Sequence, residues 1–252
     1  MLALTGCSHD EGRVAYAPYP SPTASPSVAA PSAPPAPSPL AARRAGAVPR
    51  AAVRASGLPL SAATYDATQV ITVVAASPAS TGGTLQAWDR TAGGWVPRGP
   101  AVHAYLGDQG ITTHPSETRS ATPAGSFTLT QAFGRAGDPG TALPYFRTDS
   151  SDWWVTDVTS RSYNTHYRCS SACPFDTGLG ENLYRAGFLY TYAVVIDYNR
   201  RPVTPGAGSA FFLHVTEFKP TTGCVSIPQA SLVSIMRWLS PSAHPRIIMG
   251  VA

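Results

Sequence analysis

The pattern of apolar and polar residues predicts strands along most of the chain. β-branched, aromatic and other apolar residues come in short runs, and glycine and proline separate these runs. Glycine pairs at 82–83 and 93–94 punctuate two short segments that carry Trp88 and Trp95, which is typical of a hairpin. The predicted strands are residues 69–75, 102–106, 126–133, 188–198, 210–215 and 246–251.

One segment, residues 229–239, has a helical pattern. Its larger apolar residues recur at i, i+3, i+4 and i+7, as expected of a helix with one buried face. Pro228 stands where a first helical residue would. These apolar residues are Leu232, Ile235, Met236 and Leu239. We therefore predict a mostly β domain over residues 65–252, with one clear helix toward its C-terminal end.

Residues 8–60 have a different composition. Eleven of the 25 prolines fall between Pro18 and Pro59, mixed with alanine and serine. Such a segment cannot bury enough apolar surface to offset the entropy of ordering it. We predict a disordered Pro/Ala/Ser-rich tether, and the alternative is a spacer whose length has no function.

The residues before this tether resemble a lipoprotein processing site. Leu4-Thr5-Gly6-Cys7 is typical of a bacterial lipobox, although only three residues precede it, fewer than a signal peptide needs. We predict that residues 1–7 are the remnant of a lipoprotein signal and that Cys7 carries a lipid. That lipid would hold the protein at the outer face of the cytoplasmic membrane. A coincidental match is the alternative.

Charge and apolar content argue against two functional classes. The formal net charge is +4, and no basic run is longer than a pair such as Arg43-Arg44. This scattered charge does not predict the clustered basic face of a nucleic-acid-binding protein. No stretch approaches the roughly 20 apolar residues of a bilayer-spanning helix. The oligomeric state stays open.

The cysteines suggest one disulfide and one free thiol. Cys169 and Cys173 are separated by three residues, and in an exported protein we predict that they form a disulfide. Two free thiols are an alternative, and so is a zinc site that includes His166, although zinc would need a fourth ligand. Cys224 then stays unpaired, which invites a chemical explanation.

The surroundings of Cys224 are consistent with a nucleophile. Gly223 precedes it and permits unusual backbone dihedrals, so that consecutive amide groups of the turn can stabilise an oxyanion. His214 ends an apolar strand and is the nearest upstream histidine. We expect this imidazole to raise the thiolate fraction of Cys224. A buried structural cysteine and a strand-end histidine are the alternative.

Two segments resemble a known family. Residues 208–214 (GSAFFLH) and 220–226 (PTTGCVS) are similar to the signature of L,D-transpeptidase (YkuD-like) catalytic domains, in the branch with a short His-to-Cys spacing. Weaker similarities include TPAGSF, ENLY and VIDYN, and the resemblance covers about residues 65–252. It implies a β-sandwich with the nucleophile in a cleft, and an extracytoplasmic enzyme of the bacterial cell envelope.

The resemblance also implies residue roles and a reaction. Cys224 would be the nucleophile and His214 the base, oriented by the main chain of Val215. The amides of Thr222, Gly223 and Cys224 would form the oxyanion hole. A peptidoglycan tetrapeptide stem would lose D-Ala and leave a thioester, which an amine of a second stem would resolve as a 3→3 cross-link. No metal or organic cofactor is required.

The chain departs from the family pattern at two positions. Thr222 stands where many relatives have a second histidine, and Ser226 where many have Arg or Asn near the donor peptide. Stem recognition and the preference for an amine over water are therefore open. An L,D-carboxypeptidase or amidase with the same residues is the first alternative, and a non-catalytic wall-binding lipoprotein is the second.

Four residues are predicted to bind the stem peptide. They are Tyr163, Asn164, Ser226 and Trp154. Trp154 could stack on an apolar substrate face, and core packing is its alternative. Asn164 could equally occupy a turn. Glu217 lies near His214 in sequence and could tune its pKa, and the alternative is a solvated loop acid.

Overall fold

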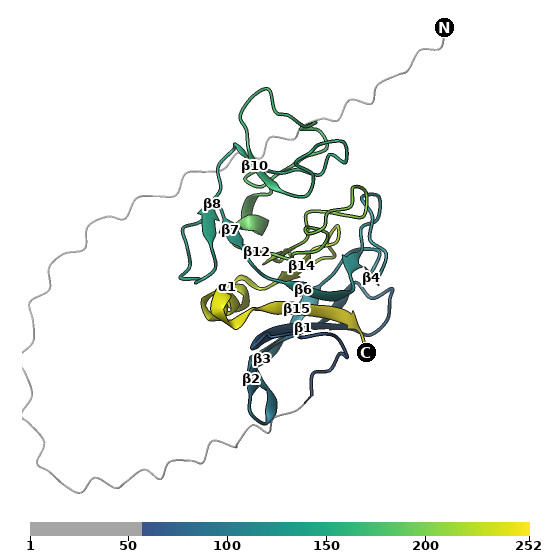
Figure 1. Cartoon of the computed structure of the whole chain (residues 1–252), viewed down its shortest axis with the longest axis vertical. Coiled ribbons are helices and arrows are strands. Elements are labelled where there is room, and N and C mark those ends of the chain that lie inside the picture. Colours follow the sequence, from purple (N-terminus) through teal and green to yellow (C-terminus); the bar gives the residue numbers. More distant parts are fainter. Residues whose placement is uncertain (1–56) are drawn as a thin grey trace, which may run out of the picture. The chain divides into compact units, whose positions relative to one another are not determined.

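The computed structural model describes residues 57–252. The predicted lipid site at Cys7 and the tether up to residue 56 lie outside these residues. The described part is mostly β, which confirms the predicted class. A curled sheet of ten strands forms its body (Figure 1), in the order β6-β15-β1-β2-β3-β14-β13-β12-β7-β8.

The strands of this sheet are β1 (Gln69–Ala75), β2 (Gly82–Thr91), β3 (Gly94–Tyr105), β6 (Gly125–Thr128), β7 (Ala132–Gly134), β8 (Tyr145–Arg147), β12 (Ala193–Val195), β13 (Phe212–Val215), β14 (Val225–Ile227) and β15 (Arg246–Val251). A small sheet has the order β10 (His166–Arg168), β9 (Asp152–Trp154) and β11 (Glu181–Asn182). A third pairs β4 (Ile111–Thr112) with β5 (Thr122–Pro123). The helices are α1 (Gln229–Trp238) and the 3-10 turns η1 (Gly187–Tyr190) and η2 (Pro241–Ala243).

Several predicted elements are confirmed. β1 and β15 have the predicted bounds and lie side by side as a parallel pair (Figure 1). β2 and β3 form the predicted hairpin, with Gly94 at a φ of +122° where β3 begins. The helix also forms as predicted, but Pro228 is its N-cap residue rather than its first helical residue.

The single strand predicted over residues 126–133 is wrong. The chain forms two strands there, because β6 pairs with β15 whereas β7 pairs with β12 in another part of the sheet. Between them Leu129 is fully buried. The carboxylate of Asp197 accepts hydrogen bonds from the hydroxyls of Thr128 and Thr130, which holds this crossing segment.

The long strand predicted over residues 188–198 is also wrong. Gly187 has a φ of +67° and begins the 3-10 turn η1. This turn buries Tyr190 and leaves Phe188 exposed. Only β12 remains as a strand in this segment.

Two leucines near the start of the described residues pack against the sheet. Leu60 is 9% exposed and, with Leu58, packs against Val70 of β1 and Ile248 of β15. These two leucines lie before residue 65, where the predicted domain begins. Leu60 is buried and Leu58 is partly buried, and this apolar contact stabilises the attachment of the segment to the sheet.

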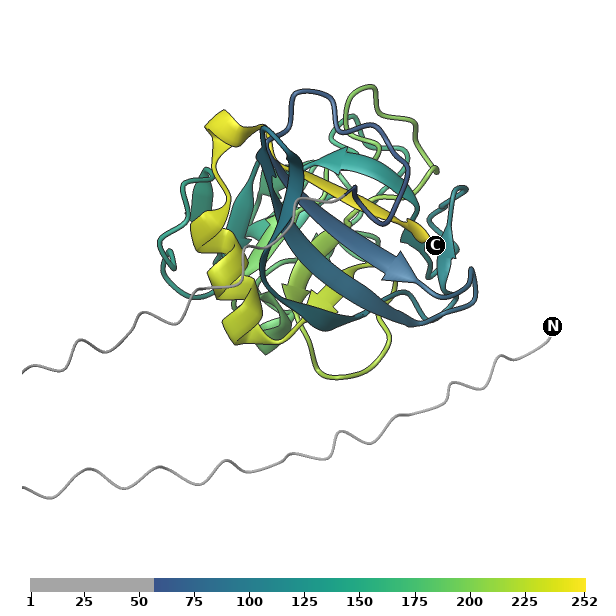
Figure 2. The same cartoon turned by 90° about the horizontal axis from the view of Figure 1, so that it is seen from below.

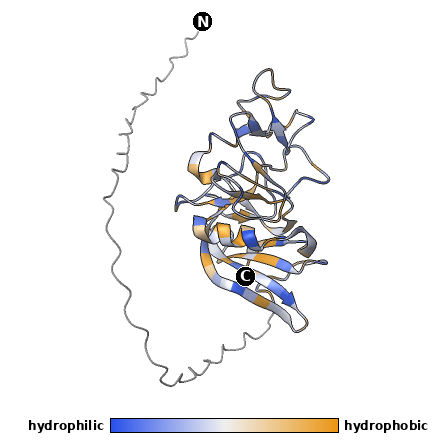
Figure 3. Ribbon diagram, turned by 90° about the vertical axis from the view of Figure 1, so that its left-hand side faces the viewer, coloured by the Kyte–Doolittle hydropathy of each residue, from blue (hydrophilic) through white to orange (hydrophobic). Residues whose placement is uncertain are grey.

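Helix α1 covers one face of the sheet. Leu232, Ile235 and Met236 are buried in the largest apolar cluster, which also contains Leu213 and Val225 of the central strands. Figure 2 shows the helix beside the curled sheet, and Figure 3 shows hydrophobic and hydrophilic residues side by side along it. Within residues 57–252 no helix has the length and apolar content to cross a membrane.

Candidate active site

The two central strands place Cys224 and His214 on the same face of the sheet. β13 and β14 are parallel neighbours, and His214 pairs with Ser226. Side chains two residues apart in a strand share a face, so Phe212, His214, Cys224 and Ser226 lie on one side. Phe212 and Cys224 accordingly belong to a second apolar cluster, distinct from the one under helix α1.

The thiol of Cys224 is almost enclosed. The residue is 7% exposed, the amide of Phe212 donates to its sulfur at 3.4 Å, and the thiol donates to the carbonyl of Ala210 at 3.4 Å. Burial, aided by the negative charge of Glu181, raises the pKa of Cys224 to about 12. Cys224 is therefore a thiol at neutral pH, contrary to the expected increase in thiolate.

The imidazole of His214 is held in one orientation. Its Nδ1 lies 2.8 Å from the carbonyl oxygen of Val215. A carbonyl can only accept a hydrogen bond, so Nδ1 carries the proton and Nε2 has the free electron pair. Burial lowers the pKa of His214 to about 4, with smaller opposing effects from the Val215 carbonyl and from Glu217. The ring is neutral at pH 7, as a base must be.

The turn before Cys224 requires glycine. Gly223 has a φ of +136°, and a Cβ there would lie 2.7 Å from the ring of Phe211 and 3.2 Å from the carbonyl oxygen of Ala121. No other residue can adopt this conformation in the space available. The predicted special backbone at Gly223 is therefore present.

The predicted oxyanion hole needs one correction. The amide of Gly223 donates to the hydroxyl of Thr221 at 3.1 Å, and that hydroxyl donates to the carbonyl of Cys224 at 2.7 Å. The Gly223 amide is therefore already engaged within the turn. The amides of Thr222 and Cys224 have no acceptor among residues 57–252 and remain as two open donors.

Cys224 opens onto two cavities. The first has a volume of about 450 Å³ and is lined by hydroxyl groups and by Glu117 and Arg119. The second has a volume of about 340 Å³ and contains His214. Thr222, Cys224 and Glu181 line both cavities, so two ligands could approach the same sulfur from different directions.

Of the predicted stem-binding residues, Ser226 lines the second cavity. Trp154 is only 1% exposed and lines neither cavity. Its ring packs edge-on against Phe212 with centroids 5.0 Å apart, and its Nε1 donates to Oδ1 of Asn164 at 2.8 Å. The prediction that Trp154 binds substrate is therefore wrong, and it is a core residue behind the site.

Tyr163 and Asn164 are likewise structural. Asn164 has a φ of +57°, and its Nδ2 donates to the carbonyls of Tyr198 and Asn199 at 3.0 and 2.7 Å. Every polar group of its side chain is used inside the protein. Tyr163 is buried, and its hydroxyl donates to Glu117. Neither residue lines either of the two cavities at Cys224, so neither contacts a stem peptide bound there.

Two residues of the site were not predicted. They are Tyr190 and Glu181: the hydroxyl of Tyr190 donates a hydrogen bond to the carboxylate of Glu181. The ring of Tyr190 contacts His214 edge-on, with centroids 5.3 Å apart. The only signal in the sequence was the ENLY segment, which contains Glu181 but suggests no role for it.

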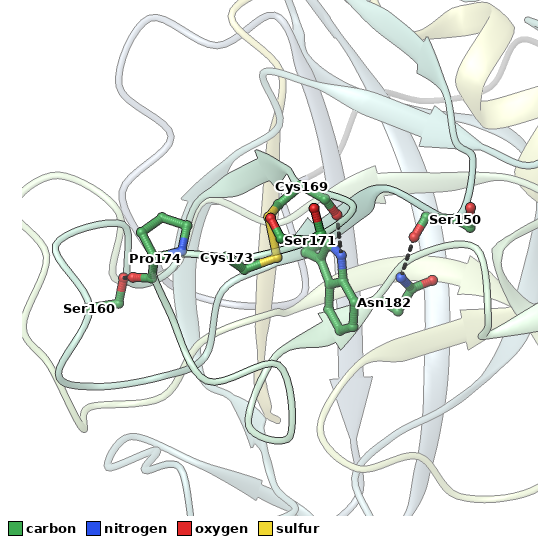
Figure 4. Close-up of a disulfide and its surroundings, with 8 residues drawn as sticks. Ser150, Ser160, Cys169, Ser171, Cys173, Pro174 and Asn182 are labelled. Carbon is green, nitrogen blue, oxygen red and sulfur yellow. Dashed lines mark hydrogen bonds between the residues drawn. A yellow bond between two sulfur atoms is a disulfide. The ribbon is translucent and has the colours of Figure 1, made fainter.

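Cys169 and Cys173 form a disulfide (Figure 4). The nearby Nε2 of His166 lies 2.7 Å from the carboxylate of Asp152. The three proposed zinc ligands therefore have other partners, which contradicts the zinc alternative. Among residues 57–252 no group of three or more His, Cys, Asp or Glu is arranged to hold a metal ion.

The disulfide loop supports one wall of the first cavity. The carbonyl of Cys169 accepts a hydrogen bond of 3.0 Å from Nε1 of Trp153. Trp153 and Phe175 pack around Gly180, whose Cβ would lie 3.2 and 3.1 Å from their rings. Gly180 lines the first cavity beside Glu181. The loop is thus connected to the site through two aromatic rings.

Comparisons with known proteins add no relative. No family model, curated protein or solved structure matches the chain. The resemblance to L,D-transpeptidases therefore depends on the sequence motifs, and any function has to be argued from the geometry around Cys224.

Proposed function

We propose that the protein is a cysteine acyltransferase of the bacterial cell wall, an L,D-transpeptidase with Cys224 as nucleophile and His214 as base. The observation that carries this proposal is the shared cavity of the two side chains, with Nε2 of His214 freed by the Nδ1 bond to Val215. The curled sheet with apolar clusters on both faces of its central strands is compatible with the β-sandwich of that family.

The protonation states favour a concerted first step. Because the thiol and the imidazole are both neutral at pH 7, Nε2 takes the thiol proton as the sulfur attacks the carbonyl of the donor. The open amides of Thr222 and Cys224 then stabilise the oxyanion. The imidazolium returns the proton to the departing amine of D-Ala, which leaves a thioester on Cys224.

The second step needs another substrate. In a transpeptidase an amine of a second stem attacks the thioester and restores the thiol. The two cavities that meet at Cys224 supply one approach for the donor and one for the acceptor. A hydrolase needs only one peptide-sized cavity at its nucleophile, so this arrangement favours transfer over hydrolysis.

The proposed location of the protein is the cell envelope, outside the cytoplasmic membrane. The disulfide between Cys169 and Cys173 suits an oxidising compartment, where the cell wall is built. A lipid on Cys7 and a Pro/Ala/Ser-rich tether would let a membrane-anchored domain reach peptidoglycan. At about 3.1 Å per residue of polyproline geometry, some fifty residues span on the order of 150 Å when extended.

The full chain incubated with disaccharide-tetrapeptide, followed by mass spectrometry, tests the proposal. We expect loss of D-Ala, an acyl adduct on Cys224 and a cross-linked dimer among the products. The Cys224→Ala variant serves as the control and should show none of these. Tripeptide without dimer would identify a carboxypeptidase, and absence of any adduct would favour a non-catalytic wall-binding protein.

A further inference from the structure

A carboxylate lies directly beside the proposed nucleophile. Glu181 is in the short strand β11, which pairs with β9 through Trp154. One of its oxygens accepts a hydrogen bond from the hydroxyl of Tyr190, and both Glu181 and Cys224 line each of the two cavities. Glu181 thus faces the same two cavities as the sulfur and is held by a hydrogen bond from Tyr190.

The second oxygen of Glu181 has no donor. Within residues 57–252 no side chain or amide donates a hydrogen bond to it, and the residue lines both cavities. A partly buried carboxylate without a cationic partner loses hydration that no protein charge replaces. Burial raises the pKa of Glu181 to about 7, and the bond from Tyr190 opposes this only in part. The Glu181 carboxylate therefore lacks a cationic partner, and a cation bound in one of the two cavities would supply it.

The charges of the two cavities differ. The second cavity contains three carboxylates, those of Asp108, Glu181 and Glu217, against the single cation of Lys219. Lys219 pairs with Glu217 at 3.1 Å, which leaves the other two carboxylates unpaired. The first cavity contains Arg119 in addition to its acids. A positively charged ligand therefore fits the second cavity better.

We propose that Glu181 is the acceptor-recognition residue: its free oxygen binds the protonated amine of the acceptor stem in the second cavity and removes a proton from it. This inference rests on the proposed function, because it names the chemistry of the second substrate. It also explains why a partly buried carboxylate lies close to the proposed nucleophile.

The proton balance of the acceptor step is complete. One N–H bond of the ammonium breaks, its proton moves to Glu181, and the freed electron pair forms the new C–N bond at the thioester carbonyl. The C–S bond breaks, and the thiolate takes the second amine proton through His214. An ammonium, a carboxylate and a thioester thus become an amide, a carboxylic acid and a thiol.

A purely structural role for Glu181 makes a different prediction. If the residue only holds Tyr190, then glutamine serves equally well, because its amide oxygen also accepts the tyrosine hydrogen bond. If the residue binds an ammonium, Glu181→Gln loses the charge that the ligand needs. Glu217→Gln is the matched control, since it removes a carboxylate of the same cavity that is already paired with Lys219.

Binding without turnover tests the proposal. The full chain carrying Cys224→Ala is titrated by calorimetry at about pH 8, where Glu181 is ionised, with two probes. One is a stem tripeptide that ends in a diamino acid with a free side-chain amine, and the other is the same peptide acetylated on that amine. We expect the free amine to bind at least about tenfold more tightly, as for a charge-assisted hydrogen bond.

The variants decide the assignment. Adding Glu181→Gln should reduce the preference for the free amine to less than about threefold, whereas adding Glu217→Gln should keep most of it. Equal binding of the two probes, binding of neither, or a preference that survives Glu181→Gln overturns the proposal. A wild-type protein that keeps the preference but forms no adduct with tetrapeptide would overturn the transpeptidase function and leave the amine site standing.

Discussion

The Nδ1 of His214 donates a hydrogen bond of 2.8 Å to the carbonyl oxygen of the next residue, Val215. This bond decides which ring nitrogen can act as a base. Its acceptor is a main-chain carbonyl, so no substitution of residue 215 by another L-residue removes it. Burial keeps the ring neutral. The neutral ring and the neutral thiol therefore form no ion pair at pH 7.

Cys224 should react slowly with small electrophiles. Its pKa is raised from 9.0 to about 12 by burial and by Glu181, so the thiolate is a very small fraction at pH 7. We expect alkylation by iodoacetamide at pH 7 to be at least about tenfold slower than that of an unstructured cysteine peptide. The rate constant, measured by mass spectrometry of the Cys224 peptide, should rise with pH without a plateau below about pH 10.

His214→Ala should leave this slow alkylation nearly unchanged, because the neutral imidazole is not the source of a thiolate. It should still abolish adduct formation with a tetrapeptide donor, which needs the base. Faster alkylation of Cys224 than of the peptide would instead show a thiolate–imidazolium pair and would contradict the protonation states described here.

Glu181 should make the protein less stable as the pH rises. Folding raises its pKa from 4.5 to about 7, so the protonated form favours the folded state and the ionised form opposes it. This stability is complete below pH 4.5 and is lost as the pH rises through 7. Tyr190, which donates to this carboxylate, and Cys224, which lines the same cavities, stay protonated over that interval because burial raises both of their pKa values.

Glu181→Gln removes this titration. By urea unfolding we expect the free energy of unfolding of the variant to exceed that of the wild type by about 1–3 kcal/mol at about pH 8. The difference should shrink toward zero at about pH 4. A difference that is the same at both pH values would show that the carboxylate titrates normally.

Gly223→Ala should disable the oxyanion turn. The new methyl group would lie 2.7 Å from the ring of Phe211, at a φ of +136°, so the turn must shift and its open amides with it. We expect adduct formation to fall by at least about 100-fold, the usual effect of losing an oxyanion donor. Gly137→Ala is the control, because nothing lies within 4 Å of its Cβ, and it should retain the wild-type rate.

Much of the fold could be predicted because its strands carry local signals. The β-branched run of β1 and the apolar run of β15 have the bounds that their residues suggest. Residues 126–133 have an equally good strand pattern, yet the chain crosses between two parts of the sheet there. Asp197, which holds that crossing, is far away in the sequence. Such a tertiary contact leaves no trace in a local pattern.

The candidate site could likewise be predicted only where its residues are close together in sequence. Cys224 and His214 could be found because a short turn and a strand end place rare residue types close together in sequence. The small sheet and the bond from Tyr190 place Glu181 in the cavities that Cys224 lines, so no spacing rule connects it to Cys224. Trp154 was misassigned because an aromatic side chain suits a groove and a core equally well.

The disulfide should be present in exported protein. Trypsin cleaves after Arg168 and Arg185, so one peptide contains both Cys169 and Cys173. We expect iodoacetamide to modify this peptide only after reduction. Modification without reductant would show two free thiols. In that case Cys173→Ser would not lose the stability, about 2 kcal/mol, that a disulfide closing so short a loop contributes.

Trp154→Phe should separate packing from substrate contact. The substitution keeps an aromatic ring against Phe212 but removes the Nε1 donor to Asn164, which leaves a buried acceptor with one partner fewer. We expect the free energy of unfolding to fall by about 1–3 kcal/mol. The KM for a tetrapeptide donor should stay within about twofold of the wild-type value, because Trp154 lines neither cavity.

The matched control is Trp88→Phe, which removes a similar bond of 2.9 Å to the hydroxyl of Thr72 in the β1–β2 pair. It should lose comparable stability with the same unchanged KM, whereas a KM raised in Trp154→Phe alone would return this tryptophan to the substrate groove.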